Sequence, residues 1–488
     1  MRLVIAGHSF GYEMECVVRI FYPGEKIAVE IDGAMAGDTL AAVAESCGDE
    51  MRLTAAVRLG DFNETDSLLA GANTPPEDWE RLLGALLFGL LCRQTGTRPS
   101  WGILTGVRPV RFARSMRARG MTEAAIFANL TENYLVLPEK ARLVWETAQR
   151  EESILEQNRP GDFSLYISIP FCPSRCVYCS FVSHEIGKCL KLMPDYIRLL
   201  CEELAETAAY AKEVGLRLRT VYIGGGTPTT LSAEELGCIM QTVQEHFDCE
   251  NLLEYTVEAG RPDTITRKKL LTLKQWGAGR ISINPQTMND EVLAEIGRRH
   301  TAQQVRDSYD LARDIGFDSI NMDLIAGLPG DTDESFADTL AQVLAMEPEN
   351  ITVHTLTVKR AAHLREKDNA FDRPTMDISA CVDTARQRLG QAGYEPYYMY
   401  RQKGTKENLE NIGYSKPGLE GHYNVLIMEE EQTILAVGAG AVTKLCKPVN
   451  QIQRVYNFKY PYEYISRFEE ILQRKESIRT FLQENIAK

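Results

Sequence analysis

Three cysteines stand within eight residues of one another, directly after a short apolar segment: Cys172, Cys176 and Cys179, in YISIPFCPSRCVYCSF. Thiolates are soft ligands that suit zinc, copper(I) and iron–sulfur clusters. A zinc site usually adds a second Cys-x2-Cys or His-x3-His pair. Neither occurs here, although His184 is near enough in sequence to be a fourth ligand. The spacing favours a [4Fe–4S] cluster on three thiolates, with one iron open to another ligand.

Glycines and carboxylates mark the ends of later apolar segments. GGGTPTTL begins at Gly224, directly after an apolar run. Glycines let a backbone approach a ligand closely, and the same stretch also reads as a strand-to-helix turn capped by Ser232. Glu258 ends EYTVEA, and Asp323 lies among Ile, Met and Leu. A carboxylate in apolar surroundings needs a partner, which a ligand or Arg298 would supply.

These residues fall within a regular alternation of predicted strands and helices. Six segments read as strands, at 166–169, 220–225, 254–259, 280–285, 319–327 and 350–358. Amphipathic helical stretches lie between them, near 194–214, 232–247, 266–276, 288–314 and 333–346. Strands joined by crossover helices pair in parallel with right-handed connections. The fold class is therefore α/β, a doubly wound sheet or a partial TIM-type barrel, with ligands at the carboxyl ends of the strands.

Two regions flank this alternation. The first begins with predicted strands at 2–7, 17–22, 26–31 and 55–60 and continues with helices over 77–150. Polar residues over 151–163 predict a linker. The last region carries a predicted helix near 378–392, strands at 395–401 and 432–442, and a helix from about 461. The predicted domains are 1–160, 161–364 and 365–488.

The composition is that of an ordinary globular protein, with 44% hydrophobic residues, 25% charged residues and a net charge of −14 over 488 residues. Nucleic-acid affinity depends on neutralising phosphates, so we expect no nucleic-acid partner. The most apolar window, 82–92, is shorter than the roughly 20 residues that cross a bilayer, and the N-terminus does not read as a secretory signal. We expect a buried helix there, a cytoplasmic location and no membrane insertion.

Together these motifs resemble those of radical S-adenosylmethionine (SAM) enzymes. Over about 162–445 the chain is similar to the oxygen-independent coproporphyrinogen III oxidase (dehydrogenase) family, a HemN- and HemW-like group, and is most like its HemZ branch. The resemblance implies a partial (β/α)6 TIM-type barrel, an extra N-terminal α+β domain and a smaller C-terminal α+β region. It also implies that Cys172, Cys176 and Cys179 hold a [4Fe–4S] cluster, whose open iron binds SAM.

The resemblance also assigns cofactor-binding residues. Those placed at the cluster and the first SAM are Tyr166, Gly225, Gly226, Thr227 and Glu258. Tyr178 corresponds to an aromatic residue against the adenine or a second SAM. Those that match a second SAM pocket are Gln286, Arg298, Asp323 and, more weakly, Thr357. The cofactors are therefore a cluster with one SAM or two, and no catalytic side chain is assigned.

The implied reaction is oxidative decarboxylation of coproporphyrinogen III to protoporphyrinogen IX in haem biosynthesis, with a flavodoxin- or ferredoxin-type electron donor. In the oxidase the third ligand begins a Cys-x-Cys, whereas Cys179 is followed here by Ser180 and Phe181. The haem-chaperone branch shares this departure. The alternatives are therefore a haem-binding chaperone and a radical SAM enzyme that acts on another tetrapyrrole.

Two further features bear on the substrate. Arg108, Arg111, Arg114 and Arg117 recur every three residues and form a basic stripe if the segment is helical. Because arginine pairs well with carboxylates, the stripe is a hypothesis for binding substrate propionates. A solvated face paired with acidic residues of the chain is the other interpretation. His422 is a candidate haem ligand or substrate contact, with a structural role as the alternative.

Overall fold

The structure is a computed structural model that describes residues 1–488 except 72, 181–182, 358–375, 403–408, 448–450 and 487–488. The chain divides into two compact units. The first comprises Met1–Ala148 with Met399–Glu410, and the second comprises Gln149–Tyr398 with Asn411–Lys488. The boundary predicted at 364/365 lies outside the described residues, so the division into three domains stays a prediction.

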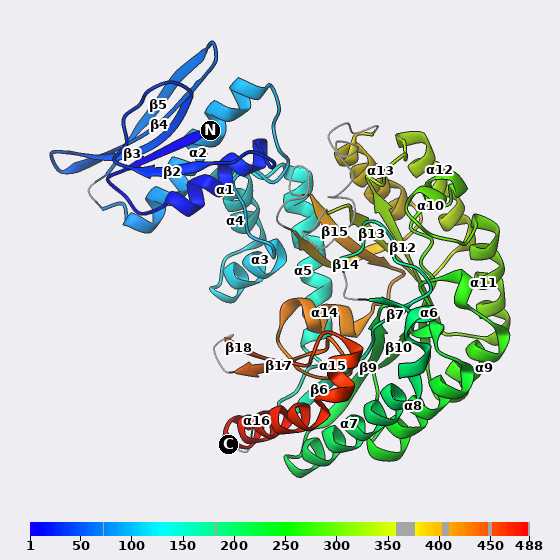
Figure 1. Ribbon diagram of the computed structural model, residues 1–488. Coiled ribbons are helices and arrows are strands. Elements are labelled where there is room, and N and C mark those ends of the chain that lie inside the picture. Colours follow the sequence, from blue (N-terminus) through cyan, green and yellow to red (C-terminus); the bar gives the residue numbers. More distant parts are fainter. Residues whose placement is uncertain (72, 181–182, 358–375, 403–408, 448–450, 487–488) are drawn as a thin grey trace. The chain divides into compact units, whose positions relative to one another are not determined.

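The second unit is built on a mixed 11-stranded sheet whose centre is parallel (Figure 1). All six predicted strands are present: β6 (Asp162–Ile169), β9 (Arg217–Gly225), β10 (Glu254–Glu258), β11 (Arg280–Ser282), β12 (Ser319–Ala326) and β13 (Asn350–Thr355). They pair in parallel in that order. A seventh parallel strand, β16 (Thr433–Val437), pairs with the other side of β6. The predicted partial TIM-type barrel is confirmed, with this additional strand.

The parallel strands have one apolar and one polar face, because successive side chains point to opposite sides. On β9, Val221 and Ile223 are fully buried, while Tyr222 between them points to the other face. Figure 1 shows the helices outside the curved sheet, so the polar positions share its inner side. The covering helices are α7 (Met193–Glu213), α8 (Ala233–His246), α9 (Arg267–Gln275), α11 (Ala302–Ile315) and α12 (Asp333–Met346).

The helix predicted over 288–314 is wrong as one element. It is divided into α10 (Asp290–Glu295) and α11, each with its own N-cap, Asn289 and Thr301. Gly297 lies between them at φ 79°, a backbone conformation that favours glycine. This interruption brings Arg298 and His300 to the carboxyl side of the sheet instead of the outer surface of one long helix.

The C-terminal part completes both edges of this sheet. β15 (Glu410–Ser415) pairs antiparallel with β13, and β14 (Glu395–Arg401) lies beyond it. At the other edge β17 (Val442–Lys447) and β18 (Gln451–Tyr456) extend β16 in antiparallel fashion. The predicted strand 432–442 covers β16 and reaches only the first residue of β17, because Gly438 and Gly440 turn the chain at positive φ between them. The helices here are α13 (Ile378–Gln391), α14 (His422–Glu429), α15 (Pro461–Ser466) and α16 (Phe468–Ile486).

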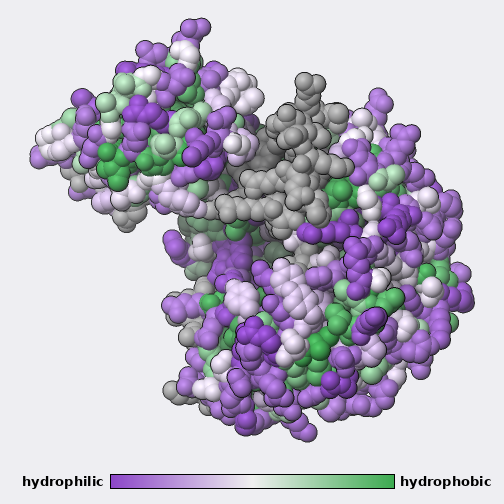
Figure 2. All heavy atoms as spheres, in the orientation of Figure 1, coloured by the Kyte–Doolittle hydropathy of each residue, from purple (hydrophilic) through white to green (hydrophobic). Residues whose placement is uncertain are grey.

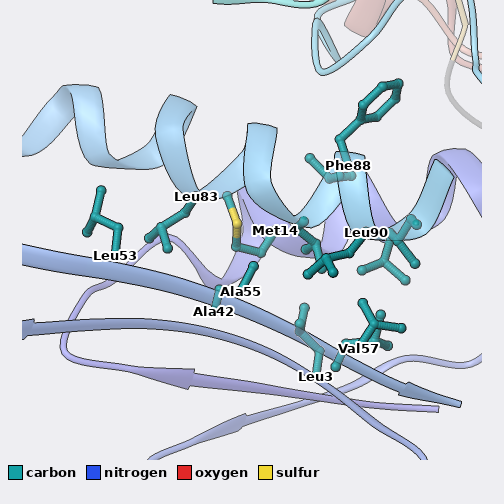
Figure 3. Packing of buried hydrophobic residues seen from close by; sticks show 14 of the residues in the cluster. Leu3, Met14, Ala42, Leu53, Ala55, Val57, Leu83, Phe88 and Leu90 are labelled. Carbon is teal, nitrogen blue, oxygen red and sulfur yellow. The ribbon is translucent and has the colours of Figure 1, made fainter. Parts of the chain in front are cut away.

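The first unit has a five-stranded sheet in the order β2-β1-β3-β4-β5. Its strands are β1 (Arg2–Ala6), β2 (Ala28–Ile31), β3 (Thr39–Cys47), β4 (Glu50–Leu59) and β5 (Phe62–Ala70). Helices α1 (Gly11–Phe21) and α2 (Pro76–Thr95) pack on it around a common core. Figure 3 shows part of that core and labels Leu3, Met14, Ala42, Leu53, Ala55, Val57, Leu83, Phe88 and Leu90.

The strand predicted at 17–22 is wrong, because these residues belong to α1. The buried residues of α1 are Met14, Val17, Val18 and Ile20, which follow helical spacing and face the core. The β-branched residues suggested a strand, but tertiary packing overrides such propensities. The apolar window 82–92 is part of α2, and Leu83, Leu87, Leu90 and Leu91 are fully buried, as predicted.

Helices follow in the rest of the first unit: α3 (Pro109–Ala118), α4 (Glu123–Ala128), a π-helical turn (Asn129–Asn133) and α5 (Pro138–Leu155). Helix α5 continues into the predicted linker 151–163, so the linker begins later than expected. Three arginines of the basic stripe lie on α3, and Arg108 precedes its first turn. The guanidinium of Arg117 lies 5.7 Å from the centre of the Trp145 ring.

No helix in the described part of the chain is both long and apolar enough to cross a membrane. On the face drawn in Figure 2, hydrophilic side chains cover much of the outer helices of the second unit. This distribution agrees with the ordinary proportion of charged residues in the sequence, 25%.

One ion pair is fully enclosed in the first unit. Lys140 Nζ donates to Glu410 Oε1 at 2.5 Å, and both side chains have no exposed surface. Trp101 Nε1 donates to the other oxygen of Glu410 at 2.7 Å. The guanidinium of Arg401 stacks over the Trp101 ring at 4.7 Å. A late strand of the chain therefore takes part in the core of the N-terminal unit.

Replacing Lys140 with Met should destabilise the protein by about 3–5 kcal/mol, since it removes the ammonium group that donates to the buried Glu410 carboxylate. Urea unfolding at neutral pH measures the change. Arg93→Ala is the matched control, because its exposed pairs with Glu64 and Asp66 contribute at most about 1 kcal/mol. Equal losses of stability in the two variants would contradict the assignment of Lys140 and Glu410 as a buried ion pair.

Candidate active site around the cysteine loop

The segment 172–179, here called the cysteine loop, follows β6 at the carboxyl ends of the parallel strands. Its first cysteine, Cys172, lies on the short strand β7 (Phe171–Cys172), which pairs with β8 (His184–Glu185). Cys176 is buried, and its carbonyl accepts a hydrogen bond from the amide of Cys179 at 3.1 Å. Among the described residues no three Cys, His, Asp or Glu side chains are gathered as a ready-made ion site. The ligand assignment therefore depends on spacing and surroundings.

Hydrogen-bond donors adjoin two of the three sulfur atoms. Thr227 Oγ1 donates to Cys172 Sγ at 3.4 Å, and Arg261 Nη1 donates to Cys176 Sγ at 3.7 Å. Burial raises the pKa of the Cys172 thiol, and the donors and the nearby cation oppose this by favouring the thiolate, which is the ligand form of cysteine. The donor set thus fits a cluster held by thiolates. His184, the fourth ligand of the zinc alternative, packs its ring against Tyr460 at 5.6 Å.

The glycine stretch packs directly against the cysteine strand. A Cβ on Gly226 would lie 2.6 Å from the carbonyl oxygen of Phe171 and 3.0 Å from Cys172 Sγ. A Cβ on Gly224 would lie 3.0 Å from Glu258 Oε1, and Gly225 has φ 112°. Side chains are excluded at these positions, so the end of β9 exposes backbone between a cysteine and a carboxylate. The predicted helix cap is also confirmed, since Ser232 caps α8.

Glu258 ends β10 on the inner side of the sheet. Tyr222 Oη donates to Glu258 Oε1 at 2.7 Å. Burial raises the pKa of Glu258 to about 7, and the charge of Asp323 adds to this, although the Tyr222 hydrogen bond opposes it. A carboxyl group poised between its two protonation states near neutral pH is typical of a functional site. It can accept a hydrogen bond from a bound hydroxyl or amino group.

Three tyrosines form a stacked group beside Glu258. The Tyr222 and Tyr423 rings are 4.4 Å apart, and Tyr166 lies 6.2 Å from Tyr222 and 6.3 Å from Tyr423. Sequence analysis identified Tyr166 and missed the other two. The signal for Tyr222 was available, because it occupies the inward position of β9 directly opposite Tyr166. Tyr423 comes from α14, and no spacing in the sequence connects it with β9.

Arg298 and Asp323 do not pair with each other, which corrects the partnership suggested by the sequence. Arg298 donates to Tyr178 Oη at 3.1 Å and to the carbonyls of Gly260 and Asn284. Asp323 accepts from Asn321 Nδ2 at 2.8 Å, with His354 Nε2 3.9 Å away. The interruption between α10 and α11 directs Arg298 toward the cysteine loop, away from β12.

Gln286 and Thr357 occupy different surroundings. Gln286 is buried, and its backbone has φ 68°, a strained conformation for this residue. Its backbone N–H donates to the carbonyl of Asp323 at 2.9 Å. Such strain is concentrated at functional sites. Thr357 is partly buried, and its hydroxyl donates to the carbonyl of Thr355 at 3.4 Å. No contact of Thr357 with the other candidate residues is found among the described residues.

His422 lies at the opposite ends of the strands from the cysteine loop. It begins α14, and the amide of the next residue, Tyr423, donates to the carboxylate of Glu254 at 3.3 Å. Glu254 is the first residue of β10, whereas Glu258 at the cluster side is the last. The histidine is therefore separated from the cysteines by the length of a strand.

This fold and site define the protein's class. A family model described as the radical SAM superfamily matches residues 166–343, which include the three cysteines, the glycine stretch and Glu258. Proteins of this superfamily use a [4Fe–4S] cluster and SAM. The coproporphyrinogen III oxidase HemN of Escherichia coli has a similar fold, with a TM-score of 0.52 and 24% identity over 65% of this chain and 71% of that one.

Curated relatives identify the family within this class. The oxygen-independent coproporphyrinogen-III oxidase-like protein HemZ of Bacillus subtilis is 40% identical over 385 residues, 78% of this chain and 77% of its own. The haem chaperone HemW of Haemophilus influenzae is 31% identical over 62% of this chain and 75% of its own. The oxygen-independent coproporphyrinogen III oxidase of Helicobacter pylori is 36% identical over 48% and 52%. The chain belongs to the oxygen-independent coproporphyrinogen III oxidase-like family of radical SAM proteins, as its motifs indicated.

The raised pKa of Glu258 predicts a pH-dependent stability. Since the folded pKa of about 7 exceeds the ordinary value of 4.5, this carboxyl group favours the folded state below about pH 4.5, and the advantage is lost as pH rises through 7. At pH 8 the cluster-free Glu258→Gln variant should therefore be more stable than the unmodified protein, by at most about 3 kcal/mol.

Chemical denaturation at pH 8 and pH 5 measures this difference, which should shrink toward the lower pH. Glutamine retains an oxygen that accepts from Tyr222, so the hydrogen bond is preserved in the variant. A stability difference of the same size at both pH values would show that the carboxyl group titrates normally.

Proposed function

We propose that this protein is a radical SAM oxidoreductase that converts coproporphyrinogen III to protoporphyrinogen IX without oxygen, in the cytoplasm. The observation that carries the radical SAM part is the position of the Gly224–Thr227 backbone, which contacts Cys172 on one side and approaches Glu258 on the other. The tetrapyrrole substrate is supported by the 40% identity to a coproporphyrinogen-III oxidase-like relative over 78% of the chain.

The cofactor is held by residues from several strand ends. Cys172, Cys176 and Cys179 would bind the cluster, with the backbone of Gly225 and Gly226 and the carboxylate of Glu258 beside its open position. When bound, the cluster and SAM supply a 5′-deoxyadenosyl radical, which forms together with methionine when one electron is accepted. Tyr166 and Thr227 border the same space.

A second SAM is proposed beside Arg298. This guanidinium is buried, and no carboxylate lies within ion-pair distance of it among the described residues. A buried cation is costly without an anion, and the carboxylate of a ligand would complete its surroundings. Tyr178, Gln286 and Asp323 are proposed to border this second position, with Thr357 as a weaker candidate.

The proposed decarboxylation conserves atoms and electrons. Each of two propionate side chains loses one hydrogen atom, carbon dioxide and one electron, and a vinyl group remains. The 5′-deoxyadenosyl radical that bound SAM would supply accounts for the hydrogen atom, which would leave as 5′-deoxyadenosine. The released electron passes to an acceptor, and a flavodoxin- or ferredoxin-type protein is the proposed donor of the initiating electron.

The reaction can be tested with protein reconstituted anaerobically with iron and sulfide, then given dithionite, SAM and coproporphyrinogen III. We expect 5′-deoxyadenosine and vinyl-bearing products by mass spectrometry. Cys176→Ala should reduce SAM cleavage to the background level, because one of the three ligands is lost. Ser232→Ala, which changes only a helix cap on the same side of the sheet, is the control and should retain cleavage.

The outcomes separate the two parts of the proposal. SAM cleavage that persists in Cys176→Ala would contradict the cluster assignment. 5′-Deoxyadenosine formed with the tetrapyrrole unchanged would contradict the decarboxylase reaction alone and leave a radical SAM enzyme that acts on another substrate.

A haem chaperone is the second candidate. The observation that favours it is the sequence after Cys179, where Ser180 and Phe181 replace the Cys-x-Cys of the oxidase. Several relatives with this family's motifs are also named haem chaperones. The two functions differ in whether the protein keeps a tetrapyrrole bound or converts it.

A haem titration distinguishes the two. If the protein is an oxidase, haem should produce no stoichiometric Soret shift, and His422→Ala should behave identically, because His422 lies at the far ends of the strands. A shift that saturates at one haem per chain would favour the chaperone. Loss of that shift in His422→Ala would identify the ligand.

A further inference from the structure

Arg261 is a buried arginine at the rim of the cysteine loop. It lies three residues after Glu258 and directly before a short 3-10 helix, Pro262–Thr264, at the carboxyl end of β10. Only 3% of its surface is exposed. Arginine is almost never buried to this extent unless it is paired, so its partners explain its position.

One edge of the guanidinium is fixed by Asp263. Arg261 Nε donates to Asp263 Oδ1 and Nη2 donates to Oδ2, both at 3.0 Å. Although burial opposes it, His300 and the guanidinium of Arg261 hold the pKa of Asp263 well below its usual range, so the aspartate stays charged. A two-point pair of this kind fixes orientation as well as position.

The other edge faces the cysteine loop. Nη1 and Nη2 of Arg261 each donate to Ser174 Oγ at 3.2 Å, and Nη1 lies 3.7 Å from Cys176 Sγ. Ser174 Oγ in turn donates to the carbonyl of Gly297 at 3.1 Å. The guanidinium therefore connects the end of β10, the loop and the turn between α10 and α11.

We propose that Arg261 is a positioning residue that fixes the Ser174–Cys176 segment and, by donating to Cys176 Sγ, makes the bound cluster easier to reduce. This inference rests on the cysteine ligands assigned under the proposed function. Hydrogen bonds to cluster sulfurs and the local net charge set the potential of such clusters. Reduction by one electron adds one negative charge, which the adjacent guanidinium stabilises.

The geometry also specifies why arginine is needed. A lysine side chain carries a point charge on a flexible stem. The planar guanidinium of Arg261, by contrast, contacts Asp263, Ser174 and Cys176 at the same time. Arg261→Lys should therefore keep much of the charge effect and lose the fixed orientation of the loop. Arg261→Gln should lose both.

The test uses the full chain reconstituted anaerobically, without substrate. Iron content, the electron paramagnetic resonance spectrum after dithionite, and the midpoint potential are measured for the unmodified protein, Arg261→Gln and Arg261→Lys. Arg313→Gln is the control, because it removes a guanidinium–carboxylate pair with Glu349 that adjoins the amino end of β12. We expect about a tenfold loss in the one-electron reduction equilibrium for Arg261→Gln, which is about 59 mV toward negative potential.

For Arg261→Lys we expect a smaller shift with an altered resonance line shape, and for the control neither change. If Arg261→Gln retains no iron while Arg261→Lys does, the positioning role is supported. A potential and spectrum unchanged in Arg261→Gln would overturn the proposal, as would equal losses in all three variants. Unmodified protein that assembles no cluster would overturn the ligand assignment and the proposal together. A cluster without tetrapyrrole turnover would contradict only the proposed reaction.

Discussion

The close approach of the β9 backbone to the cysteine strand is the constraint on which the site depends. No side chain fits at Gly226, because its Cβ would lie 3.0 Å from Cys172 Sγ and nearer still to the carbonyl of Phe171. Two consequences follow from this packing. The Thr227 hydroxyl reaches the Cys172 sulfur, and the backbone of Gly224 and Gly226 lies close to Glu258 and to the cysteine respectively. A parallel sheet supplies the geometry, since the carboxyl ends of all its strands meet at one edge.

Burying the polar side chains of the inner face would cost free energy if they lacked hydrogen-bond partners, and most of these side chains have such partners. Tyr222 donates to Glu258, Asn321 donates to Asp323, and Thr220 Oγ1 donates to Ser164 Oγ at 2.7 Å. The apolar outer face supplies the burial that stabilises the sheet. The same alternation that builds the core therefore also assembles polar side chains inside it, where a ligand can compete for their hydrogen bonds.

The sequence alone predicted the parallel strands and the cysteine and glycine segments well, because period-two alternation and short motifs are local signals. It failed where local signals conflict with packing, as at Val17 and Val18, which are β-branched and helical, or where one glycine divides a helix, as at Gly297. The strands β3, β5, β15 and β18 and the two-residue strands β7 and β8 were not predicted. Tyr423 and Arg261 could not be assigned from sequence either, since their roles depend on contacts with residues more than 80 positions away.

Two buried arginines lie beside the cysteine loop, and they differ in their ion-pair and hydrogen-bond partners. Arg261 has a carboxylate, Asp263, at 3.0 Å, so its charge is neutralised within the protein and its remaining donors can fix a loop. Arg298 has no carboxylate within ion-pair distance among the described residues; it donates to two carbonyl oxygens and the Tyr178 hydroxyl and also interacts with Cys176. A buried cation without a carboxylate partner is stabilised further by an anionic ligand. Under the proposed function, the first arginine would belong to the framework of the site, and the second would face the charged ligand.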